Sequence, residues 1–143
     1  MSIASTLSIR TLLEINAALS SLEGTPTIVK NEAEKTEKAV TVPYKFSGKA
    51  RWNLAKNIGL LKRVADNFTL ARDALILQIT GGGGTIEPTN ETAIKEFNDK
   101  LIELLAVQES TKGLLSFTVA DLNLDENQIP LATLTILEPI VTE

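Results

Sequence analysis

The sequence contains no cysteine and no histidine among its 143 residues. Without cysteine the chain forms no disulfide scaffold. Without either residue it lacks the usual ligands of structural zinc, the imidazole base of hydrolytic triads and any thiolate nucleophile. These two absences exclude most common enzyme mechanisms. A chain of this length buries enough surface to hold a core without disulfides or a metal, so we expect a single domain over residues 1–143.

Long apolar runs are also missing. A helix that spans a bilayer needs about 20 apolar residues, and charged residues or glycines interrupt every apolar stretch here. Residues 1–7 lack the basic start and the apolar block of a secretory signal. We therefore expect a soluble, intracellular protein.

Charges of opposite sign are concentrated in two parts of the chain, although the formal net charge is only −4. Residues 38–72 contain eight basic residues and one acidic residue, whereas residues 87–143 contain eleven acidic and three basic ones. The two parts pair with each other, within the monomer or between subunits, or the basic surface is left open for an anionic ligand. Binding to a genomic duplex is disfavoured, because the pI is about 5.0 and phosphate-dominated affinity requires a broad positive surface.

Apolar residues at spacings of three and four predict four helices, over residues 8–22, 50–79, about 90–109 and 131–138. The second helix carries a heptad-like seam, which comprises Leu54, Ile58, Leu61, Ala65, Phe68, Arg72 and Leu75. A helix of 30 residues is about 45 Å long, which is long for a domain of this size. It therefore either kinks at Gly59 or packs on a second subunit, and residues 81–84, four glycines, end it.

Two segments alternate apolar and polar residues as half-buried strands do. These are Val40–Phe46, which Pro43 confines to an edge position, and Leu115–Val119. Two strands are marginal alone, so we expect them to pair with each other or with another chain. The charged segment Asn31–Lys38 is expected to be a loop or a short exposed helix. The predicted fold class is α+β and mainly helical, with a long central helix, two further helices and a small two-stranded β element, in an oligomer.

Three motifs resemble catalytic or ligand sites and are better explained otherwise. The four glycines lack the Lys-Ser/Thr of a phosphate loop and follow a helix C-terminus, which repels anions. Asp121, Asn123 and Asp125 match the opening of a calcium loop, but the required Gly and Glu are absent at later positions. The carboxylates at residues 96, 99 and 103 lie on a solvated helix face beside two lysines. We expect no metal, no cofactor and no enzymatic activity.

The start of the long helix carries the most informative pattern. Lys49, Trp52, Lys56 and Arg63 follow one another at helical spacings, so the only tryptophan shares a stripe with three cations. Tryptophan can stack on a purine while lysine and arginine bind phosphate. The predicted ligand-binding residues are Lys49, Arg51, Trp52, Lys56, Asn57 and Arg72. The alternative is that Trp52 anchors the helix against the strand that carries Tyr44 and Phe46.

Four segments together resemble a family of small bacteriophage proteins of unknown function. They are LLEINAAL (12–19), YKFSGKARWNLAKNIGLLKRVADNFTLARDAL (44–75), KEFNDKLIELL (95–105) and VADLNLDENQIPLATLTILEPIV (119–141). In that family a short strand leads into an AKN helix and the chain closes on a helix ending in LEP. The sequence departs from the family in the 31–38 insertion and in its four glycines. The resemblance implies a viral or prophage origin and transfers no enzymatic activity.

Three functions are consistent with these patterns. The first is a non-enzymatic phage protein in the host cytoplasm that oligomerises through the long helix and sequesters a nucleotide-derived immune signal of the host. The second is a structural or assembly protein of the virion. The third is a protein-protein inhibitor of a host factor that uses its acidic half to mimic nucleic acid.

Overall fold

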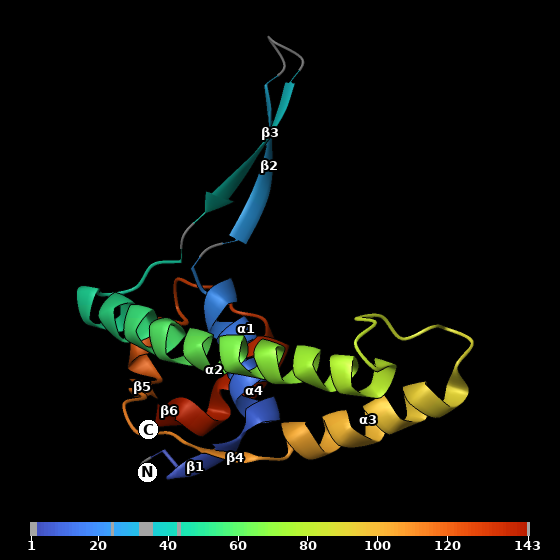
Figure 1. The fold of residues 1–143 in the computed structure, drawn as a ribbon. Coiled ribbons are helices and arrows are strands. Elements are labelled where there is room, and N and C mark those ends of the chain that lie inside the picture. The colour runs from blue at the N-terminus through green and yellow to red at the C-terminus, as the bar shows by residue number, and fades with distance from the viewer. Residues whose placement is uncertain (1–2, 24, 32–35, 43, 143) are drawn as a thin grey trace.

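The computed structural model describes residues 3–23, 25–31, 36–42 and 44–142 (Figure 1). Helix α1 (Ile9–Ser21) lies in the centre of the body. Its N-cap is Ser8, whose side chain accepts a hydrogen bond from the backbone N–H of Thr11 at 3.2 Å. The cap satisfies one of the amide groups that have no partner in the first turn.

The hydrophobic core joins α1 to two distant parts of the chain. Helix α2 (Gly48–Thr80) contributes its first turns, and the C-terminal segment contributes η1 (Ala120–Leu122), α4 (Leu131–Leu137) and η2 (Glu138–Ile140). The fully buried side chains of the core are Leu12, Ile15, Leu19, Leu22, Leu61, Leu137 and Ile140. The body is therefore closed by both ends of the chain and by only the first part of α2.

Helix α2 confirms the predicted long helix. Ser47 caps its N-terminus by accepting a hydrogen bond from the N–H of Ala50 at 3.1 Å. The helix runs unbroken through Gly59 and ends at Gly81, which has the left-handed φ of 64° that favours glycine. Helix α3 (Glu91–Leu105) begins at the N-cap Asn90 and packs antiparallel to the C-terminal half of α2 (Figure 1).

The strand pairing differs from the prediction. Strand β2 (Thr25–Asn31) pairs antiparallel with β3 (Thr36–Val42) in a hairpin. Strand β5 (Phe117–Thr118) pairs in parallel with β6 (Val141–Thr142), so the two predicted strands do not pair with each other. A neighbouring segment closes a hairpin at less entropic cost than a distant one, which explains why β3 pairs with β2.

Boundaries of three predicted elements are also corrected. Asn31 and residues 36–38 belong to strands, so the predicted loop or helix is wrong there, and residues 32–35 and Pro43 lie outside the described residues. Tyr44 and Phe46 follow β3 as non-strand residues that pack against the core. The third helix ends at Leu105 because Gln108–Ser110 forms β4, which pairs antiparallel with β1 (Thr6–Ser8).

The predicted fold class is confirmed as α+β and mainly helical, with one long helix. The β2–β3 hairpin projects away from the helical body in Figure 1, whereas β1 and β6 (Val141–Thr142) lie on the opposite side. Across the described parts of the chain, none of the helices has both the length and the apolar character needed to cross a membrane.

Candidate functional site

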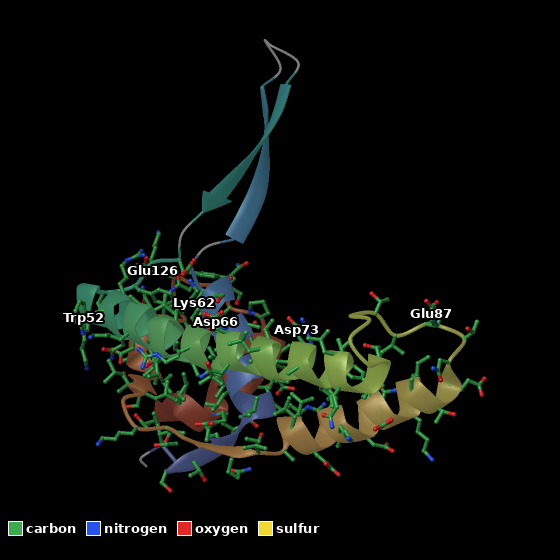
Figure 2. The ribbon with its side chains drawn as sticks, in the orientation of Figure 1. Trp52, Lys62, Asp66, Asp73, Glu87 and Glu126 are labelled. Atoms are coloured by element: carbon green, nitrogen blue, oxygen red, sulfur yellow. The ribbon has the colours of Figure 1, made fainter. Side chains whose placement is uncertain are left out.

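The start of α2 presents Trp52 to solvent. The side chain is 62% exposed, and Figure 2 shows it near the N-terminal end of the helix. The ammonium nitrogen of Lys56 lies 5.1 Å from the centroid of the indole ring. This is the geometry of a cation–π contact. Trp52 therefore does not anchor α2 against Tyr44 and Phe46, which instead contact each other with ring centroids 6.0 Å apart.

Arg51 faces a different direction from Trp52, because successive residues on a helix are separated by about 100°. Its guanidinium donates a hydrogen bond to the backbone oxygen of Tyr44 at 2.7 Å. The contact ties the incoming chain to the first turn of α2. Arg51 therefore stabilises the start of α2. It lies only at the edge of the basic surface that Lys49 and Lys56 form around Trp52.

Asn57 lies inside the protein, with an exposed fraction of 0%. Its amide nitrogen donates to the backbone oxygen of Leu115, and its amide oxygen accepts from the N–H of Leu115, both at 2.8 Å. Asn53, one turn earlier, donates more weakly to the backbone oxygen of Ser116 at 3.4 Å. Both polar groups of Asn57 are occupied by the chain itself, so we remove it from the candidate ligand contacts.

Arg72 lies sixteen residues beyond Lys56 on the same helix. At 1.5 Å per residue this separation is about 24 Å. The Arg72 guanidinium contacts the carboxylate of its neighbour Asp73 at 3.3 Å. The structure therefore does not bring Arg72 to the other predicted residues, and the candidate site reduces to Lys49, Trp52 and Lys56, with Arg51 at its edge.

Among the described residues, one ion pair joins the two oppositely charged parts of the chain. The Lys45 ammonium lies 3.4 Å from the Glu126 carboxylate, and Asn123 and Asn127 both donate to the backbone oxygen of Lys45. Within the described ranges, no carboxylate lies within salt-bridge distance of Lys49 or Lys56. The basic charge around Trp52 is therefore exposed to solvent.

The principal cavities formed by described residues lie elsewhere. Two adjoining cavities, of about 410 and 640 Å³, share three residues and form one groove along α2. At one end α1 and the β4 segment bound the groove, and at the other end α3 does. We call it the α2–α3 groove, and its main apolar residues are Leu60, Val64, Ala71, Leu75, Leu104 and Val107. A separate cavity of about 340 Å³ lies in the C-terminal segment. We call it the C-terminal pocket, and its defining residues are Val119, Leu124, Leu131, Leu134, Thr135 and Glu138.

The glycine run and the calcium-like segment have local structural roles. Gly82 donates to the backbone oxygen of Leu77 at 2.8 Å, which closes the end of α2. The Asp121 carboxylate accepts the N–H of Thr118 at 2.9 Å. In the part of the chain that is described, no three acidic side chains are grouped as a metal site requires.

Comparison with known protein families, with curated proteins and with solved structures found no match to this chain. The resemblance to the bacteriophage family therefore stays a prediction, and the function is argued below from the surfaces alone.

Proposed function

We propose that this chain is a non-enzymatic structural or assembly protein that works as a homo-oligomer, whose subunits associate through the α2–α3 groove. The observation that carries the proposal is the incomplete burial of these two helices. No residue of α2 beyond Leu61 is buried, and Ala93 is the one buried residue of α3. The apolar faces of both helices are half-exposed, although each helix covers the other.

The composition of the groove fits a second copy of the same surface. Apolar side chains line its floor, while Arg63 and Lys100 lie with Glu103 and Glu109 among its polar residues. A surface that carries both signs of charge can complement itself across a two-fold axis. The largest exposed apolar surface of a monomer is often an interaction site.

The size of the face is close to what a small dimer interface needs. The part of α2 beyond Leu61 is about 27 Å long, and two adjacent helices are about 20 Å wide. The face thus offers roughly 500 Å² per subunit, which brings a two-fold interface close to the lower end of stable protein interfaces.

The β2–β3 hairpin supports the same proposal. Its strands pair with each other, and Figure 1 shows them extended away from the helices. A lone two-stranded hairpin is marginally stable in water. In an assembly, a neighbouring subunit would pack against the hairpin and stabilise it.

Sedimentation velocity of the wild-type chain and of two variants tests the proposal. Ala71→Glu places a charge in the groove, whereas the control Thr69→Glu places one on the opposite side of the same helix. We expect an oligomeric wild type, at least tenfold weaker association of Ala71→Glu, and no change for Thr69→Glu. A wild type that stays monomeric at its highest soluble concentration would contradict the proposal.

A second experiment tests whether the assembly is part of a phage particle. The resemblance implies a viral or prophage origin, and if the chain is a component of a phage particle, purified particles contain it in fixed copy number. Its absence from particles, together with self-association in solution, would assign the assembly to another stage of infection.

One observation favours a second candidate function, which is capture of a nucleotide-derived signal in the host cytoplasm. Exposed cations flank Trp52, and no described carboxylate neutralises them. Calorimetry with cyclic ADP-ribose isomers and cyclic dinucleotides tests it. Binding must be lost in Trp52→Ala and Lys56→Ala and retained in Lys95→Ala, and an absence of heat from every ligand would remove this candidate.

A further inference from the structure

The C-terminal pocket is an apolar cavity with no cover among the described residues. Three large apolar side chains around it are exposed, namely Val119 at 52%, Leu124 at 42% and Leu131 at 79%. Exposed apolar side chains that gather around one cavity mark an interaction site. The cavity volume of about 340 Å³ is large enough to receive one aromatic side chain, and such side chains dominate binding at interfaces.

Polar groups at one side of the pocket define what it can accept. Glu138 and Thr135 line it next to the leucines. Residues 113–143 contain five acidic residues and no basic residue. The pocket therefore favours a guest that is apolar, that carries a hydrogen-bond donor and that has positive charge beside it.

Trp52 has all three properties. Its indole is apolar, its N–H is a donor that needs a partner when buried, and Lys56 lies over the ring. Residues 44–65 contain six basic residues and no acidic one, so the surroundings of Trp52 and of the pocket have opposite charge. Trp52 is 62% exposed and does not line the pocket of its own chain.

We propose that Trp52 of one subunit inserts into the C-terminal pocket of a second copy, with Lys56 facing Glu138. The indole N–H donates to the Glu138 carboxylate, and the ring packs among Val119, Leu131 and Leu134. The contact joins two different surfaces, so it is heterologous and extends an assembly into a ring or a chain. This inference rests on the proposed function, because it adds a second contact to subunits that already associate.

Single variants test each half of the contact. Trp52→Ala removes the guest, and Leu131→Arg places a cation at the entrance of the pocket without disturbing the core, because Leu131 is exposed. Each is expected to weaken this association at least tenfold and to leave the circular dichroism spectrum unchanged. The control is Leu70→Ala, which truncates an exposed apolar side chain of α2 outside the proposed contact. It is expected to leave the mass of the assembly unchanged.

Mixing the two variants gives a sharper test. Trp52→Ala keeps an intact pocket and Leu131→Arg keeps its tryptophan, so the mixture forms one productive contact that neither variant forms alone. Lys56→Glu is likewise expected to weaken association with the wild type, and Glu138→Lys in the partner is expected to restore it, whereas Lys95→Glu has no effect.

The outcomes of these experiments distinguish the assembly function, the pocket contact and nucleotide binding from one another. If the wild type assembles and neither Trp52→Ala nor Leu131→Arg changes its mass, the contact is wrong and the assembly function stands. If the wild type is monomeric, both fail. If Trp52→Ala loses nucleotide binding while its assembly is intact, Trp52 serves the ligand and the pocket contact is wrong.

Discussion

Asn57 pairs with the backbone of Leu115 through both ends of its amide, as a neighbouring strand would. The pairing fixes the chain between β4 and β5 onto the first half of α2. Backbone groups that are shielded from water need a partner, and none of the strands in the described ranges pairs with Leu115. The single asparagine side chain therefore replaces a β-ladder at this point.

Replacement of Asn57 by alanine is expected to lower the free energy of unfolding by about 2 to 4 kcal/mol, because the part-buried N–H and C=O of Leu115 both lose their partner and the fully buried Asn57 side chain leaves a cavity. Urea denaturation measures the change. Asn98→Ala, in an exposed position of α3, is the matched control and should differ from the wild type by less than about 0.5 kcal/mol. Equal stability of the two variants would show that the Leu115 backbone finds other partners.

Two glycines of the long helix should respond oppositely to alanine. A Cβ at Gly59 meets nothing within 4 Å, so Gly59→Ala is expected to raise the free energy of unfolding by about 0.5 to 1 kcal/mol through helix propensity. Gly81 has φ of 64°, so Gly81→Ala is expected to lower it by about 1 to 2 kcal/mol. Thermal unfolding of both variants checks the sign, and a destabilised Gly59→Ala would reveal an unseen neighbour of that helix face.

Because Ser47 caps α2, its replacement by alanine should lower the stability of the protein more than its replacement by glycine. Ser47→Ala removes the acceptor for the Ala50 N–H and should cost about 1 kcal/mol, whereas Ser47→Gly should cost only about 0.3 kcal/mol. Denaturant midpoints of the two variants give the comparison. A larger loss for glycine than for alanine would contradict a capping role.

The charge around Trp52 predicts how ions quench its fluorescence. Trp52 is the only tryptophan, so the signal is unambiguous. Lys49 and Lys56 attract anions to the indole, so the ratio of iodide quenching to caesium quenching should be higher for dilute protein than for free N-acetyltryptophanamide. Lys56→Glu should lower this ratio, and Lys95→Glu should not. A ratio equal to that of the free amide would show that the cations are neutralised.

The helices could be predicted from the sequence because their signals are local. Serine and asparagine commonly begin helices and glycine commonly ends them, and in the structure Ser47, Asn90 and the glycine after Thr80 are the cap residues. The spacing of apolar residues in α1 and α3 likewise depends on neighbours three and four positions away. Such patterns do not require knowledge of the rest of the fold.

The strand pairs and the composition of the site depend on distant residues. Nothing in Leu115–Val119 specifies that its partner is Val141 and not the alternating segment near Tyr44. Asn57 and Trp52 are five residues apart, and only the position of the core shows that one faces inward and the other outward. Arg72 fits the heptad-like seam in the sequence, but it lies too far along α2 from Trp52 to share a site with it.

The pairing of Thr6 with Ser110 and the burial of α1 against Leu137 and Ile140 have a consequence for biosynthesis. While residues 131–140 are still inside the ribosome, α1 has only part of its apolar contacts. Native packing of α1 must therefore wait until that segment has emerged, and until then the apolar side chains of α1 are accessible to chaperones.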